Sequence, residues 1–356
     1  MIRTHRTFVL VAIAVLAGGA AVLAAGHRLG WRLSGPAGPI AAFRDLPALA
    51  PADSNVIVFA DVSALRASPL LAQLKSLVPS QTPDADYSAF ARASGFDYQR
   101  DLDKVLFVSF PAIGKSATVA IAEGRFDREK IRAYALQSGK LERHSGVEVY
   151  LMPATAPNVA QGKTIAFAFF SDTRIAISDR DGLDSFLAGP TPAPPAQAPA
   201  AGELSLTQRV SRAGTAPLFM ITHVPDVPPN WAPGGVRSNQ LDDLAHSVRW
   251  IDLTIQPLPD KLHVTLEGEC VDPAKAASLE STLNGLRFLA QAYLGAPDAQ
   301  KQMDPQTRTL IAQLLDSAVV AHHDQWVSLS VDLTQDLLKS ALQHPPNAPH
   351  SSPLPK

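Results

Sequence analysis

The sequence predicts an α+β fold: a duplicated unit of mainly antiparallel sheet with helices packed on one face, preceded by one transmembrane helix. Three observations predict it. An uncharged apolar run lies near the N-terminus, short apolar runs alternate with turn residues, and one pattern recurs at a constant offset of 145 residues. With 356 residues, the chain is long enough for two core-forming units.

The apolar run occupies residues 8–25 and contains no charged side chain. As a helix, it spans about 27 Å, which is close to the hydrocarbon thickness of a bilayer. We therefore expect residues 1–32 to be a membrane anchor or a signal segment. The length of the run favours an uncleaved single-pass anchor in a bacterial inner membrane, with the C-terminal domain in the periplasm. The alternative is a signal peptide that is cleaved after Ala24, which releases the protein into the periplasm.

The first folded repeat is expected at residues 51–188, after a tether rich in Gly, Pro and Ala at residues 33–50. The β-branched run from Asn55 to Val62 predicts a buried strand. The spacing of the leucines that follow predicts a helix from Ser63 to Val78.

Two apolar runs with a Pro-containing turn between them predict a hairpin at residues 105–110 and 118–122. Asp127 is in the right place to cap a helix over residues 128–137, because an aspartate there accepts a free N–H of the first turn. Further apolar runs predict strands at 147–152, 165–170 and 174–178, followed by a short helix at 183–187.

Residues 189–202 contain five prolines and no charge, which indicates a linker. The second repeat is then expected at residues 203–343, and the Pro-rich tail at residues 344–356 is expected to be disordered. In the second repeat, residues 218–224 predict a strand. The segment 326–342 predicts a strand that is followed by a helix.

The repeat itself is seen when residues 104–127 are aligned without gaps to residues 249–272. Both segments have the order strand, Pro-containing turn, strand and capping Asp. In the second segment the cap is Asp272, and Pro273 follows it at the first helical position, where a missing N–H costs nothing. One face of the helix after it is apolar and comprises Ala276, Leu279, Leu283 and Leu286.

Three short motifs in this order carry a resemblance: a Pro-Ala-Asp start at residues 51–53, the VIVFADV strand at 56–62, and EGRFD at 123–127 leading into a helix. Together with the N-terminal apolar run, they resemble uncharacterised bacterial (acidobacterial-like) membrane-anchored envelope proteins. The resemblance covers residues 47–342. It implies that this chain shares their fold and their location in the cell envelope, and it implies no activity.

The charge balance argues against nucleic-acid binding. The chain has 31 Lys and Arg against 33 Asp and Glu, a net charge of −2, and no clustered basic patch. Its single cysteine, Cys270, excludes an intrachain disulfide and a multi-thiolate zinc site. Because Cys270 lies at the end of an apolar run, we expect it to be a small buried hydrophobic residue.

Two short motifs are similar to parts of ligand-binding loops, but the residues around them do not complete either loop. Ile113-Gly114-Lys115-Ser116 is similar to the end of a phosphate-binding loop, but Ser109 stands where the first glycine is needed, so nucleotide binding is not expected. Asp179-Arg180-Asp181-Gly182 is similar to the start of a calcium loop, but position 12 of that loop is Pro190. We therefore expect a turn, with Asp181 near a helix cap.

The pair His322-His323 with Asp324 is expected to be a solvated helix end, because adjacent histidines rarely reach one metal ion. The adjacent Asp242 and Asp243 diverge on a helix and do not form an acid–base pair. No G-x-S-x-G motif is present. The sequence therefore predicts no catalytic, cofactor-binding or metal-binding residues, and no cofactor.

These observations favour a non-enzymatic envelope protein that binds a partner protein, a peptide or a lipid outside the inner membrane, with residues 8–25 as its membrane contact. The alternatives are an envelope hydrolase whose catalytic residues are scattered in sequence, and a carrier that holds an apolar ligand between the two repeats.

Overall fold

The structure is a computed structural model, and it describes residues 46–75, 85–112, 115–153, 164–189, 203–224 and 247–343. The strands are β1 (Val56–Asp61), β2 (Leu102–Ala112), β3 (Lys115–Gly124), β4 (Lys140–His144), β5 (Val147–Pro153), β6 (Thr164–Phe169), β7 (Arg174–Asp179), β8 (Leu218–His223), β9 (Val248–Pro257), β10 (Lys261–Cys270), β11 (Val319–His323) and β12 (Trp326–Thr334).

The described residues also form helices, which pack on the strands. They are η2 (Pro47–Leu49), α2 (Val62–Ala67), α3 (Pro69–Lys75), α4 (Ala85–Ser94), α5 (Tyr98–Asp101), α6 (Arg128–Ser138), α7 (Arg180–Leu187), α8 (Leu206–Ala213), α10 (Pro273–Gly295), α11 (Pro297–Gln302), α12 (Pro305–Ser317) and α13 (Gln335–Gln343).

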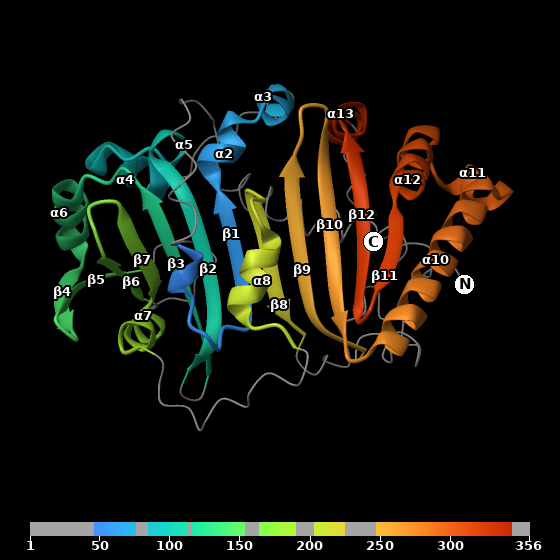
Figure 1. The fold of residues 1–356 in the computed structure, drawn as a ribbon. Helices are drawn as coiled ribbons and strands as arrows, with labels where there is room; N and C mark the ends of the chain where they lie inside the picture. The colour runs from blue at the N-terminus through green and yellow to red at the C-terminus, as the bar shows by residue number, and fades with distance from the viewer. Residues whose placement is uncertain are drawn as a thin grey trace, which may run out of the picture.

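All twelve strands belong to one sheet with the order β11-β12-β10-β9-β8-β1-β2-β3-β7-β6-β5-β4 (Figure 1). Every neighbouring pair is antiparallel. This confirms the predicted α+β fold with an antiparallel sheet. The first half of the chain, residues 46–189, contributes β1 to β7, and the second half, residues 203–343, contributes β8 to β12. The halves meet where β1 pairs with β8.

The two aligned segments have matching positions in this sheet. Residues 104–127 cover the hairpin β2–β3, and residues 249–272 cover the hairpin β9–β10. Asp127 caps α6 by accepting a hydrogen bond from the backbone N of Lys130 at 3.1 Å. Asp272 caps α10 through the N–H of Lys275 at 2.8 Å. The predicted caps are therefore confirmed.

Helices cover both faces of the sheet, so the prediction of helices on one face is wrong. Successive side chains of a strand point to opposite faces. On β6, Ala166 and Ala168 belong to the core that includes Leu183 of α7, whereas Phe167 belongs to the cluster that includes Ile131 of α6. We call these sides the α7 face and the α6 face. The α7 face carries η2, α7 and α8, and Figure 1 shows α8 in front of β8.

The buried side of the hairpin changes between the halves. In the first half, β3 points Val119 into the core on the α7 face. In the second half, the residue 145 positions later, Val264, packs on the α6 face with Leu262 and Leu70. A one-residue change of register moves a strand's apolar set to the other face. The two aligned segments therefore have the same order of strands, turn and helix. Their apolar side chains, however, point to opposite faces of the sheet.

Two predicted boundaries were wrong. The helix expected from Ser63 to Val78 is broken into α2 and α3, because Pro69 lacks an N–H and disfavours a helical residue before it. The tether expected up to residue 50 ends earlier. Leu46 is only 1% exposed and belongs to the core on the α7 face, and η2 follows it.

No helix among the described residues is long and apolar enough to cross a membrane. The apolar run at residues 8–25, most of the linker at 189–202 and the tail at 344–356 lie outside the described residues. The anchor and the disordered tail therefore remain predictions.

Candidate functional site

Arg209 of α8 is the most unusual side chain of the described residues. It is 0% exposed, although charged side chains are almost never fully buried unless they are paired. Its Nη2 donates to Glu269 Oε2 on β10, and that carboxylate is also 0% exposed. Its Nη1 lies 3.8 Å from Asp252 Oδ2 on β9. One buried cation is therefore set against two carboxylates.

Two indole rings enclose this guanidinium. The Cζ of Arg209 lies 4.3 Å from the ring centroid of Trp250 and 5.6 Å from that of Trp326. Both distances are within the range of a cation–π attraction, which is strongest for tryptophan. We call Arg209, Asp252, Glu269, Trp250 and Trp326 the Arg209 cluster.

Neighbouring polar groups hold the cluster in place. The Nε1 of Trp250 donates to Glu203 at 2.8 Å, and the amide of Gln325 donates to Glu269 Oε1 at 2.7 Å. Arg212, one turn after Arg209, donates to Glu267 at 2.9 Å, and its Cζ lies 4.2 Å from the Trp326 ring. Arg212 therefore makes the same two kinds of contact at the exposed edge of the cluster that Arg209 makes in its interior, one with a glutamate and one with the Trp326 ring.

The cluster leaves polar atoms unmatched. Within the described residues, neither oxygen of Asp252 accepts a hydrogen bond, and Nε and Nη1 of Arg209 donate none. Burial raises the pKa of Asp252 from 3.8 to about 6, and the nearby Arg209 only partly opposes this rise. The carboxyl group of Asp252 is therefore neutral well below pH 6 and ionised well above it.

A row of polar side chains lies on the same face, further along β10. The Nδ1 of His263 is 2.7 Å from Asp332 Oδ1, and its Nε2 is 3.1 Å from the hydroxyl of Thr265. The Nζ of Lys261 donates to the other oxygen of Asp332 at 2.7 Å. These hydrogen bonds from Lys261 and His263 lower the pKa of Asp332. We call Lys261, His263, Thr265 and Asp332 the polar row.

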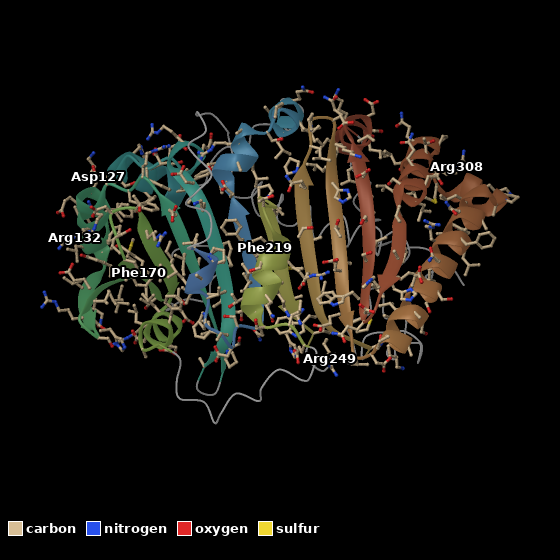
Figure 2. The ribbon with its side chains drawn as sticks, viewed as in Figure 1. Asp127, Arg132, Phe170, Phe219, Arg249 and Arg308 are labelled. Carbon is tan, nitrogen blue, oxygen red and sulfur yellow. The ribbon has the colours of Figure 1, made fainter. Side chains whose placement is uncertain are left out.

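The α6 face of the first half is apolar and open in its middle. Phe107 on β2 is 45% exposed, Ile165 on β6 is 40% exposed, and Ile177 on β7 is 37% exposed. Ala120 of β3 pairs with both Phe107 and Ile177, so it bridges them across the sheet. We call Phe107, Ala120, Ile165 and Ile177 the apolar patch. Phe219, labelled at the centre of Figure 2, belongs to the opposite face, where it stacks on Phe59 at 5.1 Å.

Two open hollows lie at the α4 and α6 end of the molecule. The larger, of about 470 Å³, is lined by residues that include Asp127 and Arg132, both labelled at the left of Figure 2. The smaller, of about 210 Å³, is lined by residues that include Arg100 and Asp101. The charges in these hollows pair with each other: Arg132 contacts Glu129, and Arg100 contacts Asp101.

Several of the short motifs found in the sequence have structural roles in the fold. Cys270 is buried at the end of β10, and burial raises the pKa of its thiol to about 11, as expected for an unreactive residue. The cap of α7 is Asp179, which accepts a hydrogen bond from the backbone N of Gly182 at 2.7 Å, and Asp181 lies in the first turn of the helix. The expectation that Asp181 lies near a helix cap is therefore confirmed. Ser116 lies on β3, and Ile113 and Gly114 lie outside the described residues.

The histidine pair is on a strand, so the predicted helix end is wrong. His322 and His323 are the last two residues of β11, where neighbouring side chains point to opposite faces. His322 contacts Glu280 and His323 contacts Asp324. Within the described ranges, no three His, Cys, Asp or Glu side chains gather as metal ligands. Asp242 and Asp243 lie outside those ranges.

Sequence reasoning missed the Arg209 cluster, although two signals were present. Ser205 followed by Gln208 is a capping box, and it predicts a helix that begins after Ser205. Asp252 and Glu269 interrupt apolar strands, and an acid in an apolar strand signals a buried partner. The pairing itself joins residues that are 60 positions apart, so no local pattern reveals it.

Comparisons with known proteins give a distant structural likeness. No family model matches the chain, and no curated protein is significantly similar to it. Among solved structures, the chain is similar to crystal form III of TP0453, with 10% identity, a TM-score of 0.40, and coverage of 84% of this chain and 98% of that chain. Crystal form I gives 9% identity, a TM-score of 0.38, and coverage of 83% and 96%. At this level the likeness carries no inference about function.

Proposed function

We propose that this chain is a non-enzymatic envelope protein that binds a partner protein through the apolar patch on the α6 face of its first half. The observation that carries the proposal is that Phe107, Ile177 and Ile165 are large apolar side chains left exposed on one sheet face, with Ala120 between the first two and Ile165 diagonal to Ile177 on the neighbouring strand. Single exposed apolar residues are normal on a surface, whereas a contiguous group marks a contact site.

The proposal includes a location in the cell envelope. The apolar run at residues 8–25 is long enough to anchor the chain in an inner membrane, with the folded part in the periplasm. We also propose that the two halves descend from one duplicated unit. Supporting this, each half contributes an antiparallel hairpin followed by an Asp-capped helix, and the halves meet through equivalent strands, β1 and β8.

The experiment uses the full chain in its native membranes, with a photoreactive amino acid in place of Phe107. We expect a discrete crosslinked partner protein from this position. The matched control has the same reactive group at His323, whose side chain is 90% exposed at the edge strand. Adding Ile177→Asp to the Phe107-labelled chain is expected to abolish the crosslink. Equal crosslinking from both positions, or a product that consists of lipid, would contradict the proposal.

A hydrolase is the second candidate, and the polar row favours it. Thr265, His263 and Asp332 are aligned as a hydroxyl, a base and an orienting carboxylate, which is the arrangement that activates a nucleophile. This candidate predicts that the full chain hydrolyses p-nitrophenyl esters, and that Thr265→Ala and Asp332→Asn each remove the activity. Turnover that is unchanged in Thr265→Ala would exclude the row as its source.

The carrier alternative is less well supported by the geometry. Five residue pairs join β1 directly to β8, so the halves meet edge to edge within one sheet. The two hollows described above lie in the first half, away from this junction.

A further inference from the structure

The underside of α8 combines an apolar contact with a charged one. Leu206, Val210 and Ala213 pack against the core on the α7 face, while Arg209 enters the space between Trp250 and Trp326. Of the eight residues of α8, only Arg209 is buried. The helix therefore depends for its position on the buried Arg209, on the contacts of Arg212 at the rim, and on a few half-buried apolar side chains.

The sheet surface beneath α8 has the chemistry of an arginine site. Asp252 and Glu269 supply carboxylates inside it, Glu267 supplies a third at its rim, and the two indoles supply flat faces. A guanidinium fits such a surface better than an ammonium does, because it is planar, stacks on aromatic rings and offers donors in a fixed fork. The surface therefore selects arginine, and its charge is complementary to a basic helix.

The helix that lies there uses only part of this surface. Both oxygens of Asp252 lack a hydrogen-bond donor among the described residues, although the side chain is almost fully buried. A buried acceptor without a partner costs free energy, which an occupant with a better-placed donor would recover. Arg209 itself keeps two donor nitrogens unmatched. The fit of α8 is therefore incomplete at its most buried point.

The residues that join α8 to the sheet belong to no strand. Gly214 ends the helix with φ +64°, a conformation that glycine adopts without strain, and β8 begins only at Leu218. The pairing of β8 with β1 and β9 does not involve residues of α8.

We propose that the surface beneath α8 is a docking site for an arginine-bearing amphipathic helix of a partner protein, and that α8 is its internal competitor. The partner helix would carry arginines at positions i and i+3 and apolar residues at i−3, i+1 and i+4, as α8 does with Arg209 and Arg212. The site lies on the opposite face of the sheet from the apolar patch, so it goes beyond the function proposed above.

The test measures binding of a fluorescein-labelled peptide with the sequence of residues 203–216 to the full chain, by fluorescence anisotropy. The chain carries Arg209→Ala and Arg212→Ala, which weaken its own α8. We expect this variant to bind the peptide at least about tenfold more tightly than the wild-type chain, whose α8 competes. A peptide with alanine in place of both arginines is expected to bind at least about tenfold more weakly, because arginines dominate such interfaces.

Two further variants keep the test decisive. Arg212→Ala alone removes only the rim contact with Glu267, so it should fold and show intermediate affinity. Arg180→Ala on α7 removes an arginine that is 52% exposed on a helix of the same length, and it should bind no better than wild type. Equal binding of the two peptides would overturn the proposal. So would the absence of peptide binding to an Arg212→Ala chain that has a native circular dichroism spectrum.

Discussion

Helices α7 and α8 lie on the same face of the sheet, have eight residues each, and bury opposite kinds of side chain. In the first half, α7 packs on β3, β6 and β7 and inserts Leu183, which is fully buried in the apolar core on this face. In the second half, α8 inserts Arg209 among carboxylates and indoles. Both helices begin at a side-chain cap, so their starts do not explain the difference.

The difference teaches how one sheet face supports two kinds of contact. Burial of Leu183 removes apolar surface from water without requiring a particular orientation. Burial of Arg209 costs desolvation, which is offset only where the acceptors are placed correctly. The apolar contact of α7 therefore depends on the surface that it buries, whereas the charged contact of α8 depends on how well the acceptors match its donors, and that match is incomplete at Asp252.

The largest expected effect comes from Arg209→Ala. It leaves Glu269 charged and buried without its partner, and breaking a buried pair in this way costs about 3–5 kcal/mol of unfolding free energy. Urea unfolding measures the loss. The control is the double variant Arg209→Met with Glu269→Met, which removes both charges and should recover most of the stability. A loss below about 1 kcal/mol for Arg209→Ala would show that the pair is not buried in solution.

Leu183→Ala is expected to cost about 3 kcal/mol, because truncating a fully buried leucine loses its transfer free energy and leaves a cavity. The same urea experiment at pH 5 and at pH 8 tests the contrast with α8. No charge is removed, so the loss should be equal at the two pH values. A loss that depends on pH would mean that α7 and α8 are energetically coupled.

Asp252 makes stability depend on pH. Its pKa rises from 3.8 to about 6 on folding, so between these values the native state binds more protons than the unfolded state. The unfolding free energy then falls as pH rises from about 4 to about 6, by at most about 3 kcal/mol from this group. Other carboxyl groups add opposite trends, so the measured quantity is the difference between wild type and Asp252→Asn. A difference that stays constant over this range would contradict the raised pKa.

Asp332→Asn tests an exposed ion pair for comparison with the buried Arg209 cluster. Asp332 of β12 pairs with Lys261 of β10. The pair of Asp332 with Lys261 is about one-third exposed, so its loss is expected to cost less than about 1 kcal/mol. Because hydrogen bonds lower the pKa of Asp332, the pair stabilises the protein above the unfolded pKa, and this contribution is lost as pH falls. Thermal unfolding at pH 7 and pH 3 measures it. A larger loss at pH 3 than at pH 7 would reverse the expected sign.

Local patterns were sufficient for most of the fold. The β-branched run that became β1, the two hairpins and the caps at Asp127 and Asp272 follow from residue preference and spacing within a few positions. Pattern reasoning missed β4 because its residues, KLERH, are mostly charged. That strand forms because β5 offers it a complete row of backbone partners at the sheet edge.

The sides of the sheet could not be predicted in this way. Alternation tells which residues of a strand share a face, but it does not tell to which side of a common sheet that face turns. Val119 and Val264 have the same place in the aligned segments and point to opposite sides of the sheet. The choice depends on which helices arrive to cover each side, and that is a long-range property.

By itself, the sequence determined the α+β class, the antiparallel hairpins, the helix caps and the buried state of Cys270, because these depend on side chains a few residues apart. Only the tertiary structure decided that the two halves share one sheet, that helices cover both of its faces, and that Arg209 is buried against Glu269. The physical reason is distance along the chain. A buried charge is tolerated only where distant segments bring its partners to it, and no local pattern records that meeting.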